Sequence, residues 1–409
     1  MDDVLLLVHR IPYPPDKGDK IRSWRLLEFL AERFNVHLGC FIDDPDDWAY
    51  TEFLEKKCAS THFEALNPLL ARARSLTGLV SGAPLTMPYY KSAAMRRWVD
   101  AVRAQPLAAE FVYSSAMAPY LEPAAPGRPR IIDFVDADSE KWRKYAERKS
   151  FPMSYVYRRE AERLGAAEVA ISQNVDVSLF VSEAEARLLA ARAGAPRDKI
   201  DWVSNGVDTD FFNPDAAFQS VAGDAGPKVV FTGAMDYWAN VDAVVWFAEE
   251  VLGALRRRHP ALQFYIVGAR PAAEVTALAA RPGVIVTGRV PDVRPYIAAS
   301  DIAVAPMRIA QGIQNKVLEA MAMARPVIAT PDGALGLEAS AGVHLEVASD
   351  GPAFADAVLD LLDDPDQRER LGRNARALME GSYSWSAKLQ RLESALRRLG
   401  LFHETSSAA

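Results

Sequence analysis

The stretch from Asp301 to Thr330 constrains the fold more than any other part of this 409-residue chain. It holds two short apolar runs, Ile302 to Ala305 and Pro326 to Ala329, on either side of a segment rich in good helix formers. Apolar runs that alternate with helical segments are typical of buried parallel strands in α/β proteins. The stretch therefore predicts a strand, a turn, a helix and a second strand.

The start of this helix is a candidate anion site. Gln311-Gly312-Ile313 is expected to open the helix, whose free amides and macrodipole attract negative charge. Lys316 and Glu319 are three residues apart and share a face one turn further on. A cation there can meet a phosphate, and a carboxylate can accept hydrogen bonds from vicinal hydroxyls. The pattern indicates a nucleotide diphosphate sugar site, with a plain amphipathic helix as the alternative.

The same residues resemble the second-half motif of glycosyltransferase family 4. Glu319-Ala320-Met321-Ala322 and Pro326-Val327-Ile328-Ala329 match its EAMA and PVVA elements. Two positions depart from it, since Gln311 stands where the family usually has a glutamate and Arg325 replaces a glycine. The sequence of residues 308–323, RIAQGIQNKVLEAMAM, is most similar to that of sugar transferases of exopolysaccharide and PEP-CTERM systems. The resemblance implies retaining transfer on a GT-B fold, with two Rossmann-like, doubly wound parallel-sheet domains facing a cleft and a C-terminal helix crossing back.

Composition argues against several other classes. A formal net charge of −7 disfavours general nucleic-acid binding. Cys40 and Cys58 suggest no disulfide framework, and the six histidines lack metal-ligand spacing. The apolar run Val4 to Val8 is too short for a signal peptide, and no stretch of about 18 apolar residues exists. We therefore predict a cytoplasmic protein without a metal or other cofactor.

The loop after that first run is a second candidate donor site. Pro12 to Asp19 follows the strand, and its prolines keep it out of a helix. Gly18, Asp19 and Arg22 partly match the glycine loop that faces the sugar donor in family 4. A simple tight turn is the competing interpretation.

A third strand end carries Asp136-Ala137-Asp138-Ser139. Asp136 and Asp138 could form the metal motif of the GT-A fold, with two carboxylates on a divalent cation. Alternatively, Asp138 or Ser139 caps the next helix and Asp136 alone faces the cleft. We favour the second interpretation, because a GT-A protein lacks a second Rossmann-like half. The resemblance implies a polar residue here, which makes Asp136 a catalytic candidate.

Residues 141–163 hold eight Lys or Arg against three Glu, with aromatic residues interleaved. On an acidic chain this stretch could lie on an anionic membrane, at the inner face of the plasma membrane, or hold an acidic glycan. A solvated helix face with its aromatic residues turned to the core is the alternative.

Two similar halves organise the chain. Ser204-Asn205-Gly206-Val207-Asp208 and Phe211 to Pro214 resemble the signature that closes the first domain in family 4, and apolar runs restart at Lys228. We predict an acceptor-side domain at 1–205, a linker at 206–227, a nucleotide-sugar domain at 228–382, a crossover helix at 383–402 and a disordered tail at 403–409.

The resemblance also assigns the donor site. Gly233 is expected near the phosphates, Arg289-Val290 near the base and Glu319 at the ribose. Met235 to Asn240 lacks the family's Arg and Lys, so charge neutralisation is expected to fall on Lys316, Arg308, Arg22 and the helix start at Gly312. The predicted catalytic residues are Asp136, Lys316 and Glu319, and the predicted donor-binding residues are Gly18, Asp19, Arg22, Gly233, Met235, Arg289, Val290, Arg308, Gln311, Gly312, Ile313, Gln314, Asn315, Lys316, Val317 and Glu319.

These assignments describe a metal-independent, retaining hexosyltransferase of exopolysaccharide biosynthesis. Its donor is a nucleotide diphosphate sugar, and its acceptor is a polysaccharide or lipid-linked glycan. Two other classes stay open at this point. One is a GT-B nucleotide-sugar epimerase or phosphorylase-like enzyme, and the other is a non-catalytic nucleotide-sugar-binding partner, which Gln311 in place of glutamate makes plausible.

Overall fold

The computed structural model describes residues 1–147, 149–194, 199–219, 221, 226–310 and 312–402. The chain forms two compact units, one from Met1–Ser204 with Leu389–Ala409 and the other from Asn205–Lys388. We call them unit 1 and unit 2. Gln311 and the tail 403–409 lie outside the described residues. No helix in the described ranges is long and apolar enough to span a membrane.

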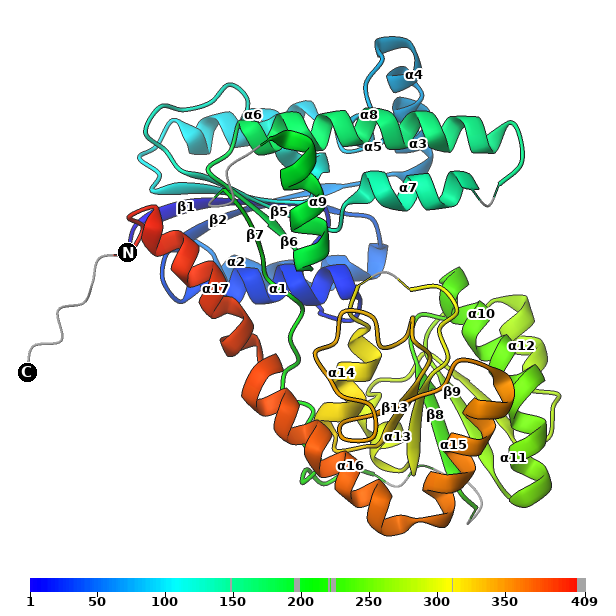
Figure 1. Ribbon diagram of the computed structural model, residues 1–409. Coiled ribbons are helices and arrows are strands. Elements are labelled where there is room, and N and C mark those ends of the chain that lie inside the picture. The colour runs from blue at the N-terminus through cyan, green and yellow to red at the C-terminus, as the bar shows by residue number, and fades with distance from the viewer. Residues whose placement is uncertain (148, 195–198, 220, 222–225, 311, 403–409) are drawn as a thin grey trace, which may run out of the picture. The chain divides into compact units, whose positions relative to one another are not determined.

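Unit 1 is built on a parallel sheet of seven strands in the order β3-β2-β1-β4-β5-β6-β7 (Figure 1). The strands are β1 Asp3–Val8, β2 Asn35–Ile42, β3 Ser60–Ala65, β4 Ala109–Tyr113, β5 Arg130–Val135, β6 Val177–Phe180 and β7 Ile200–Trp202. The helices are α1 Gly18–Ala31, α2 Thr51–Lys57, α3 Pro68–Ser75, α4 Thr77–Ser81, α5 Thr86–Tyr89, α6 Ala93–Arg103, α7 Asp138–Glu147, α8 Met153–Gln173 and α9 Glu183–Ala193, with 3₁₀ helices at Pro45–Tyr50 and Ser115–Leu121.

Helices cover both faces of this sheet, as the continuous apolar run of β1 requires. Val4 and Leu6 pack on one face with Leu27 of α1, whereas Leu5 and Leu7 pack on the other with Val99 of α6. This alternation follows from the two-residue period of a strand. All four side chains are fully buried, so β1 lies in the centre of unit 1.

Unit 2 repeats the plan with six parallel strands in the order β10-β9-β8-β11-β12-β13. The strands are β8 Lys228–Thr232, β9 Gln263–Val267, β10 Val284–Gly288, β11 Ile302–Ala305, β12 Val327–Ala329 and β13 Glu346–Val347. The helices are α10 Trp238–Trp246, α11 Leu252–Arg258, α12 Ala273–Leu278, α13 Arg294–Ala298, α14 Asn315–Ala322, α15 Gly351–Asp363 and α16 Pro365–Leu378, with π-helical turns at Phe247–Val251 and Met379–Tyr383.

The centre of unit 2 is buried on both faces as well. Phe231 of β8 packs with Val244 and Val358 on one face, and its neighbour Val230 packs with Leu318 of α14 on the other. Two doubly wound, Rossmann-like parallel-sheet units are therefore present, which confirms the predicted fold class.

The last helix, α17 (Trp385–Arg398), carries the chain back into unit 1. Its residues Leu392, Ala395 and Leu396 are buried in the same core as Val4 and Leu6. The segment expected to be a linker begins inside unit 2, where the Val207 N–H donates to Tyr383 O at 2.8 Å.

The helix expected to open at Gln311-Gly312-Ile313 begins at Asn315 instead. Gly312 has a φ of +64°, in the left-handed region, and Gln314 is extended at the N-cap. The left-handed residue turns the chain, so it cannot belong to a right-handed helix. The anion-attracting helix end therefore lies at Gln314 and Asn315, not at Gly312.

Candidate functional site

The strand order of unit 2 reverses beside β8. The chain passes from β8 outward through β9 and β10, then returns to β11 on the other side. Open α/β sheets bind ligands at such a switch point, outside the carboxyl ends of the strands. Gly233 follows β8 directly, and Met307 follows β11, so both lie at this point.

Lys316 reaches the switch point from the first turn of α14. Its Nζ donates to Asn240 Oδ1 at 3.0 Å and to Gln314 Oε1 at 3.3 Å, and lies 5.1 Å from the centre of the Phe231 ring. Its hydrogen-bond acceptors, these two amides and the Met307 thioether at 3.9 Å, are neutral, so they orient the ammonium without neutralising its charge. Burial lowers the pKa of Lys316 to about 8, opposed by the charge of Glu319. An anion bound beside this partly buried ammonium would stabilise its charged form.

Glu319 lies one turn further along α14. Burial raises the pKa of its carboxyl group to about 7, opposed by Lys316. The two groups influence each other but form no direct ion pair within the described residues. The carboxylate oxygens can therefore accept hydrogen bonds from a ligand's hydroxyl groups.

Two glycines bring the strand ends close together. A Cβ on Gly268, at the end of β9, would lie 1.7 Å from Gly233 O, and one on Gly233 would lie 2.8 Å from Asn240 Nδ2 and 3.4 Å from Lys316 Cε. No side chain fits at either position without displacing a neighbour. The backbone of Gly233 thus lies beside Lys316, and two predicted site residues from distant parts of the sequence meet.

Asn240 was not predicted, because an amide in an apolar helix carries no charge signal in the sequence. Its Nδ2 donates to Ala234 O at 2.8 Å, and this bond leaves Oδ1 directed at Lys316. Asn240 is buried. It therefore fixes the position of the Lys316 ammonium at the first turn of α10.

Three arginines follow the strands of this sheet edge. Arg308, after β11, is ion-paired with Asp242 of α10, and Arg270, after β9, is ion-paired with Asp236. Arg289, after β10, is exposed and forms no hydrogen bond or ion pair within the described ranges. Arg289 and Val290 lie two strands from β8, about 10 Å away at the usual strand spacing.

Several predicted donor-site residues are part of the core. Met235, Ile313 and Val317 are buried among apolar side chains, and the backbone N–H and C=O of Met235 are bonded to Ala269 and Ala272. Their side chains cannot reach a ligand. Asn315 accepts a hydrogen bond from Asn205 at 3.2 Å, and Gln314 donates to Gly312 O. The loop from Gly312 to Asn315 thus supports Lys316, and the predicted contact of Gln311 lies outside the described residues.

Unit 1 has its own switch point, between β1 and β4. Asp19 lies there, in the first turn of α1, which begins at Gly18. Its carboxylate accepts from Arg10 Nη1 at 2.6 Å and lies 3.7 Å from His9 Nε2. Burial opposes ionisation, yet the nearby His9 and the charge of Arg10 lower the pKa of Asp19. Sequence analysis missed His9 and Arg10, which follow β1.

Arg22 is buried in an ion pair. Its Nε donates to Asp133 Oδ2 at 2.7 Å, its Nη2 to Asp133 Oδ1 at 3.1 Å, and its Nη1 to Val203 O at 2.5 Å. A bidentate arginine–carboxylate pair of this kind satisfies the guanidinium within the protein. Arg22 therefore holds α1 against β5, and the prediction that it neutralises a diphosphate does not fit its surroundings.

Asp136 follows a strained turn at the end of β5. Val135 has a φ of +69°, and the Asp136 N–H donates back to Phe134 O at 3.0 Å, the pattern of a γ-turn. Burial raises the pKa of Asp136 to about 7, helped by the carboxylates of Glu185 and Asp138. Strain of this kind is concentrated at functional sites, so Asp136 is still a candidate. In the described ranges, no three His, Cys, Asp or Glu side chains gather as a metal site would require.

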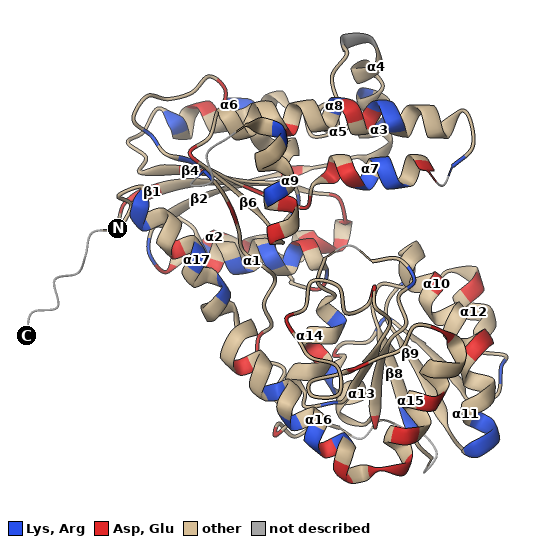
Figure 2. Cartoon of the chain, viewed as in Figure 1, with Lys and Arg blue, Asp and Glu red and all other residues tan. Residues whose placement is uncertain are grey.

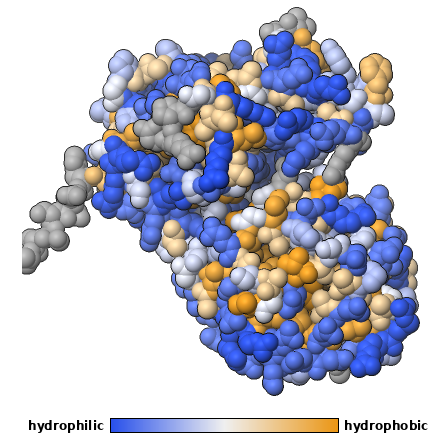
Figure 3. Space-filling model, viewed as in Figure 1, coloured by the Kyte–Doolittle hydropathy of each residue, from blue (hydrophilic) through white to orange (hydrophobic). Residues whose placement is uncertain are grey.

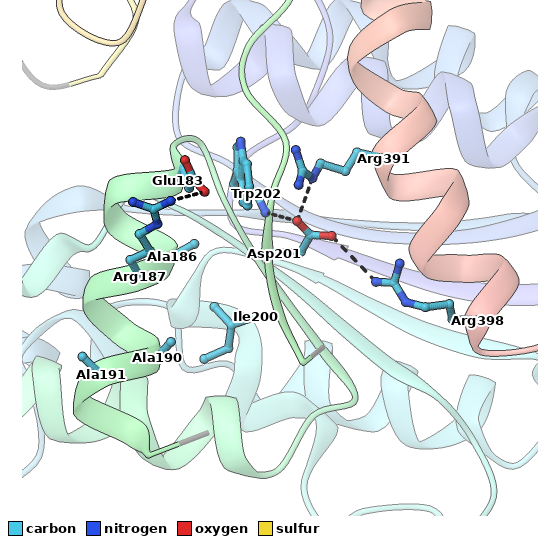
Figure 4. Close-up of a pocket in the computed structure, with 10 residues that line it drawn as sticks. All are labelled: Glu183, Ala186, Arg187, Ala190, Ala191, Ile200, Asp201, Trp202, Arg391 and Arg398. Atoms are coloured by element: carbon cyan, nitrogen blue, oxygen red, sulfur yellow. Dashed lines mark hydrogen bonds and ion pairs between the residues drawn. The ribbon is translucent and has the colours of Figure 1, made fainter. Parts of the chain in front are cut away.

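A pocket of about 660 Å³ in unit 1 contains none of the predicted residues (Figure 4). It lies between α9, β7 and α17. Arg391 of α17 lies over the Trp202 ring at 3.4 Å, and its Nε donates to Asp201 at 2.8 Å. These contacts attach α17 to the edge of the sheet. We therefore interpret the pocket as a gap in the packing between these elements.

Comparisons with known proteins agree with this geometry. Residues 226–364 match a family model described as Glycosyl transferases group 1. An alpha-D-kanosaminyltransferase of Streptomyces kanamyceticus is 32% identical over 187 residues, 44% of this chain and 47% of that protein. A D-inositol 3-phosphate glycosyltransferase of Paenarthrobacter aurescens is 32% identical over 221 residues, 49% and 52% of the two chains. The chain thus spans about half the length of these curated relatives.

Solved structures match nearly the whole chain. Sucrose-phosphate synthase of Thermosynechococcus elongatus superposes with a TM-score of 0.69 at 18% identity, over 98% of this chain and 100% of that one. Anabaena Alr3699/HepE in complex with UDP and glucose gives 0.66 at 16% identity, over 97% and 100%. The chain has the fold of GT-B glycosyltransferases, and the segment that matches the group 1 model contains Gly233, Lys316 and Glu319.

Proposed function

We propose that the chain transfers a hexosyl group, with retention, from a nucleotide diphosphate sugar to a polysaccharide or lipid-linked glycan. The observation that carries this proposal is the Lys316 ammonium, which neutral amides hold beside Gly233 at the switch point of unit 2. A leaving diphosphate needs positive charge placed before the reaction, and a fixed ammonium with the start of α14 supplies it.

The roles of the neighbouring groups follow from their positions. In this assignment Gly233 lets a phosphate approach the backbone, and Glu319 accepts hydrogen bonds from the ribose. Arg289 and Val290 are far enough from Gly233 to contact the base. We assign Asp136 to the acceptor side, on the family resemblance and on its strained turn. These charges need no metal ion, so activity should persist in EDTA. Loss of activity in EDTA with recovery in Mn²⁺ would restore the Asp136–Asp138 metal interpretation.

The names of related proteins support transfer over the two alternatives. The three curated relatives are named as transferases that act on different sugars and acceptors, and one is named as GDP-mannose-dependent. Alr3699/HepE was solved with UDP-glucose. Donors with uridine and guanosine diphosphates are therefore the first to test. The resemblance of residues 308–323 to exopolysaccharide transferases supports an exopolysaccharide acceptor and a cytoplasmic location.

The test begins with donor binding. Thermal stabilisation by a panel of UDP- and GDP-sugars should identify a donor, because a ligand of the folded state raises the melting temperature. Lys316→Met should lose this stabilisation, whereas Lys56→Met, on an exposed helix of unit 1, should keep it. NMR of the product should then show the donor's anomeric configuration. A chain that no nucleotide sugar stabilises, or that binds one without ever transferring its sugar, contradicts the proposal.

Contact of residues 141–163 with an anionic membrane also stays a prediction. The rings of Trp142, Tyr145 and Tyr157 contact one another between α7 and α8, as the helix-face alternative expects. Phe151 and Tyr155 are exposed, at 83% and 65%. The part of this stretch that could meet a membrane is therefore the turn between the two helices and the start of α8.

A further inference from the structure

Helices α3 and α4 of unit 1 turn leucines outward. Leu69, Leu70, Leu76 and Leu79 are exposed at 74%, 66%, 59% and 46%, whereas the small Ala71 is fully buried. Leu69, Arg72, Ala73 and Leu76 recur at the spacing of one helix face and are all exposed. An ordinary surface helix buries its large apolar side chains, whereas α3 exposes its leucines and buries an alanine.

The surroundings of these leucines are basic. Residues 65–99 contain five cations, Arg72, Arg74, Lys91, Arg96 and Arg97, and no Asp or Glu. The whole chain has a net charge of −7, so this stretch differs sharply from the average. Figure 3 shows apolar side chains beside α4 at this end of unit 1.

The start of α8 belongs to the same end of unit 1. Arg159 Nη2 donates to Gly78 O at 2.7 Å, and Glu160 accepts from the Leu85 and Thr86 N–H groups at 2.7 and 3.1 Å. Residues 149–158, just before this contact, hold Lys149 and Arg158 and no acidic residue (Figure 2). Their exposed Phe151, Met153 and Tyr155 add to the apolar surface.

We propose that this end of unit 1, which we call the α3–α4 surface (Leu69, Leu70, Leu76, Leu79, Phe151, Met153 and Tyr155 with the exposed cations Arg72, Lys91, Arg97, Lys149 and Arg158), docks on an anionic lipid bilayer. Exposed leucines enter the interface while arginines and lysines meet the lipid phosphates, the arrangement of interfacial helices. A second copy of the chain fits less well, because a symmetric contact brings the same basic residues together. The proposal does not depend on the donor site of unit 2.

Vesicle co-sedimentation tests it directly with the full chain. Phosphatidylglycerol–phosphatidylcholine vesicles should bind the protein, pure phosphatidylcholine vesicles should not, and raising the salt from about 0.1 to 0.5 M should weaken binding because it shortens the Debye length. Leu69→Ser with Leu70→Ser should lower the partition coefficient at least tenfold. Val343→Ser with Leu335→Ser, exposed apolar residues of unit 2, is the matched control and should change it less than twofold.

A second pair of double variants tests the contribution of charge. Arg72→Ser with Arg158→Ser should lower binding at least fivefold, whereas Arg257→Ser with Arg258→Ser, which removes the same charge from α11 of unit 2, should not. All variants should keep the wild-type melting temperature, since the exchanged side chains are exposed, and the same nucleotide-sugar stabilisation. Failure of donor binding alone would thus concern only the proposed function.

Three results would overturn the docking proposal. One is equal binding to neutral and anionic vesicles, and another is wild-type binding by the double leucine variant. The third is sedimentation velocity that shows a dimer which the leucine substitutions convert to a monomer, since the surface would then serve self-association.

Discussion

Arg22 and Arg10 of unit 1 differ from Lys316 of unit 2 in the partners that hold them. In unit 1, Arg22 is bonded to the Asp133 carboxylate and Arg10 to the carboxylates of Asp19 and Asp43. In unit 2, Lys316 is bonded to the amides of Asn240 and Gln314. A carboxylate neutralises its partner, whereas an amide only orients it. The same topology therefore yields a structural ion pair in one unit and an available positive charge in the other.

Removing each cation should have opposite consequences. Arg22→Met leaves the Asp133 carboxylate buried without its partner, which should destabilise unit 1 by about 3–5 kcal/mol. Lys316→Met replaces an ammonium held by neutral partners with an apolar chain of similar length, so unit 2 should lose about 1 kcal/mol or less. Hydrogen exchange of β5 and β8 amides measures the two effects separately. Equal losses in both units would remove the distinction between them.

Lys316→Met, which should destabilise the fold less than Arg22→Met, should have the larger effect on catalysis. Lys316→Met removes a preorganised charge from the diphosphate, and such changes cost about 10²- to 10³-fold in rate. We expect kcat/KM to fall by at least 10²-fold, measured by nucleotide release with an acceptor present. Any Arg22→Met protein that stays folded at low temperature should keep donor affinity within about threefold. A Lys316→Met enzyme with near-normal kinetics would place the donor elsewhere.

Glu319→Ala should act on the donor more than on the fold. Hydroxyl groups left without a hydrogen-bond partner in a partly buried site cost about 1–3 kcal/mol, equivalent to roughly 5- to 150-fold in affinity. The donor KM should rise while kcat changes little, and the nucleoside alone should lose affinity by a similar factor. If only the sugar part of the donor becomes less tightly bound, Glu319 contacts the sugar and not the ribose.

The pH dependence gives the smallest effect. The pKa of Lys316 is lowered to about 8, so the free protein loses this charge above pH 8. A diphosphate favours the charged form, and donor affinity should therefore fall by up to tenfold per pH unit above pH 8. Lys316→Arg keeps its charge and should flatten the profile. An unchanged slope in that variant would assign the titration to another group.

Sequence reasoning could reach the fold and could propose a centre for the candidate site. Alternating apolar runs predicted both sheets, and Lys316 with Glu319 could be read from helical spacing. The error at Arg22 has a physical cause, because its partner Asp133 lies 111 residues away and pairing cannot be seen along the chain. Asn240 was missed for a similar reason, since its role is defined by Lys316, 76 residues further on. Met235 and Ile313 lie in loops and Val317 in α14, and all three point inward, a direction that motif matching does not determine.

The return of α17 to unit 1 has a consequence for the order of folding during synthesis. Unit 1 needs Leu392, Ala395 and Leu396 to complete one of its cores, and these residues leave the ribosome after all of unit 2. At about 5–20 residues per second, unit 2 takes roughly 10–40 s to synthesise. Throughout that time the apolar face of the first unit stays open. Once Lys388 has been added, the second unit has every residue it requires, whereas the first still lacks Leu392, Ala395 and Leu396. Unit 2 should therefore finish folding first, although it is translated second.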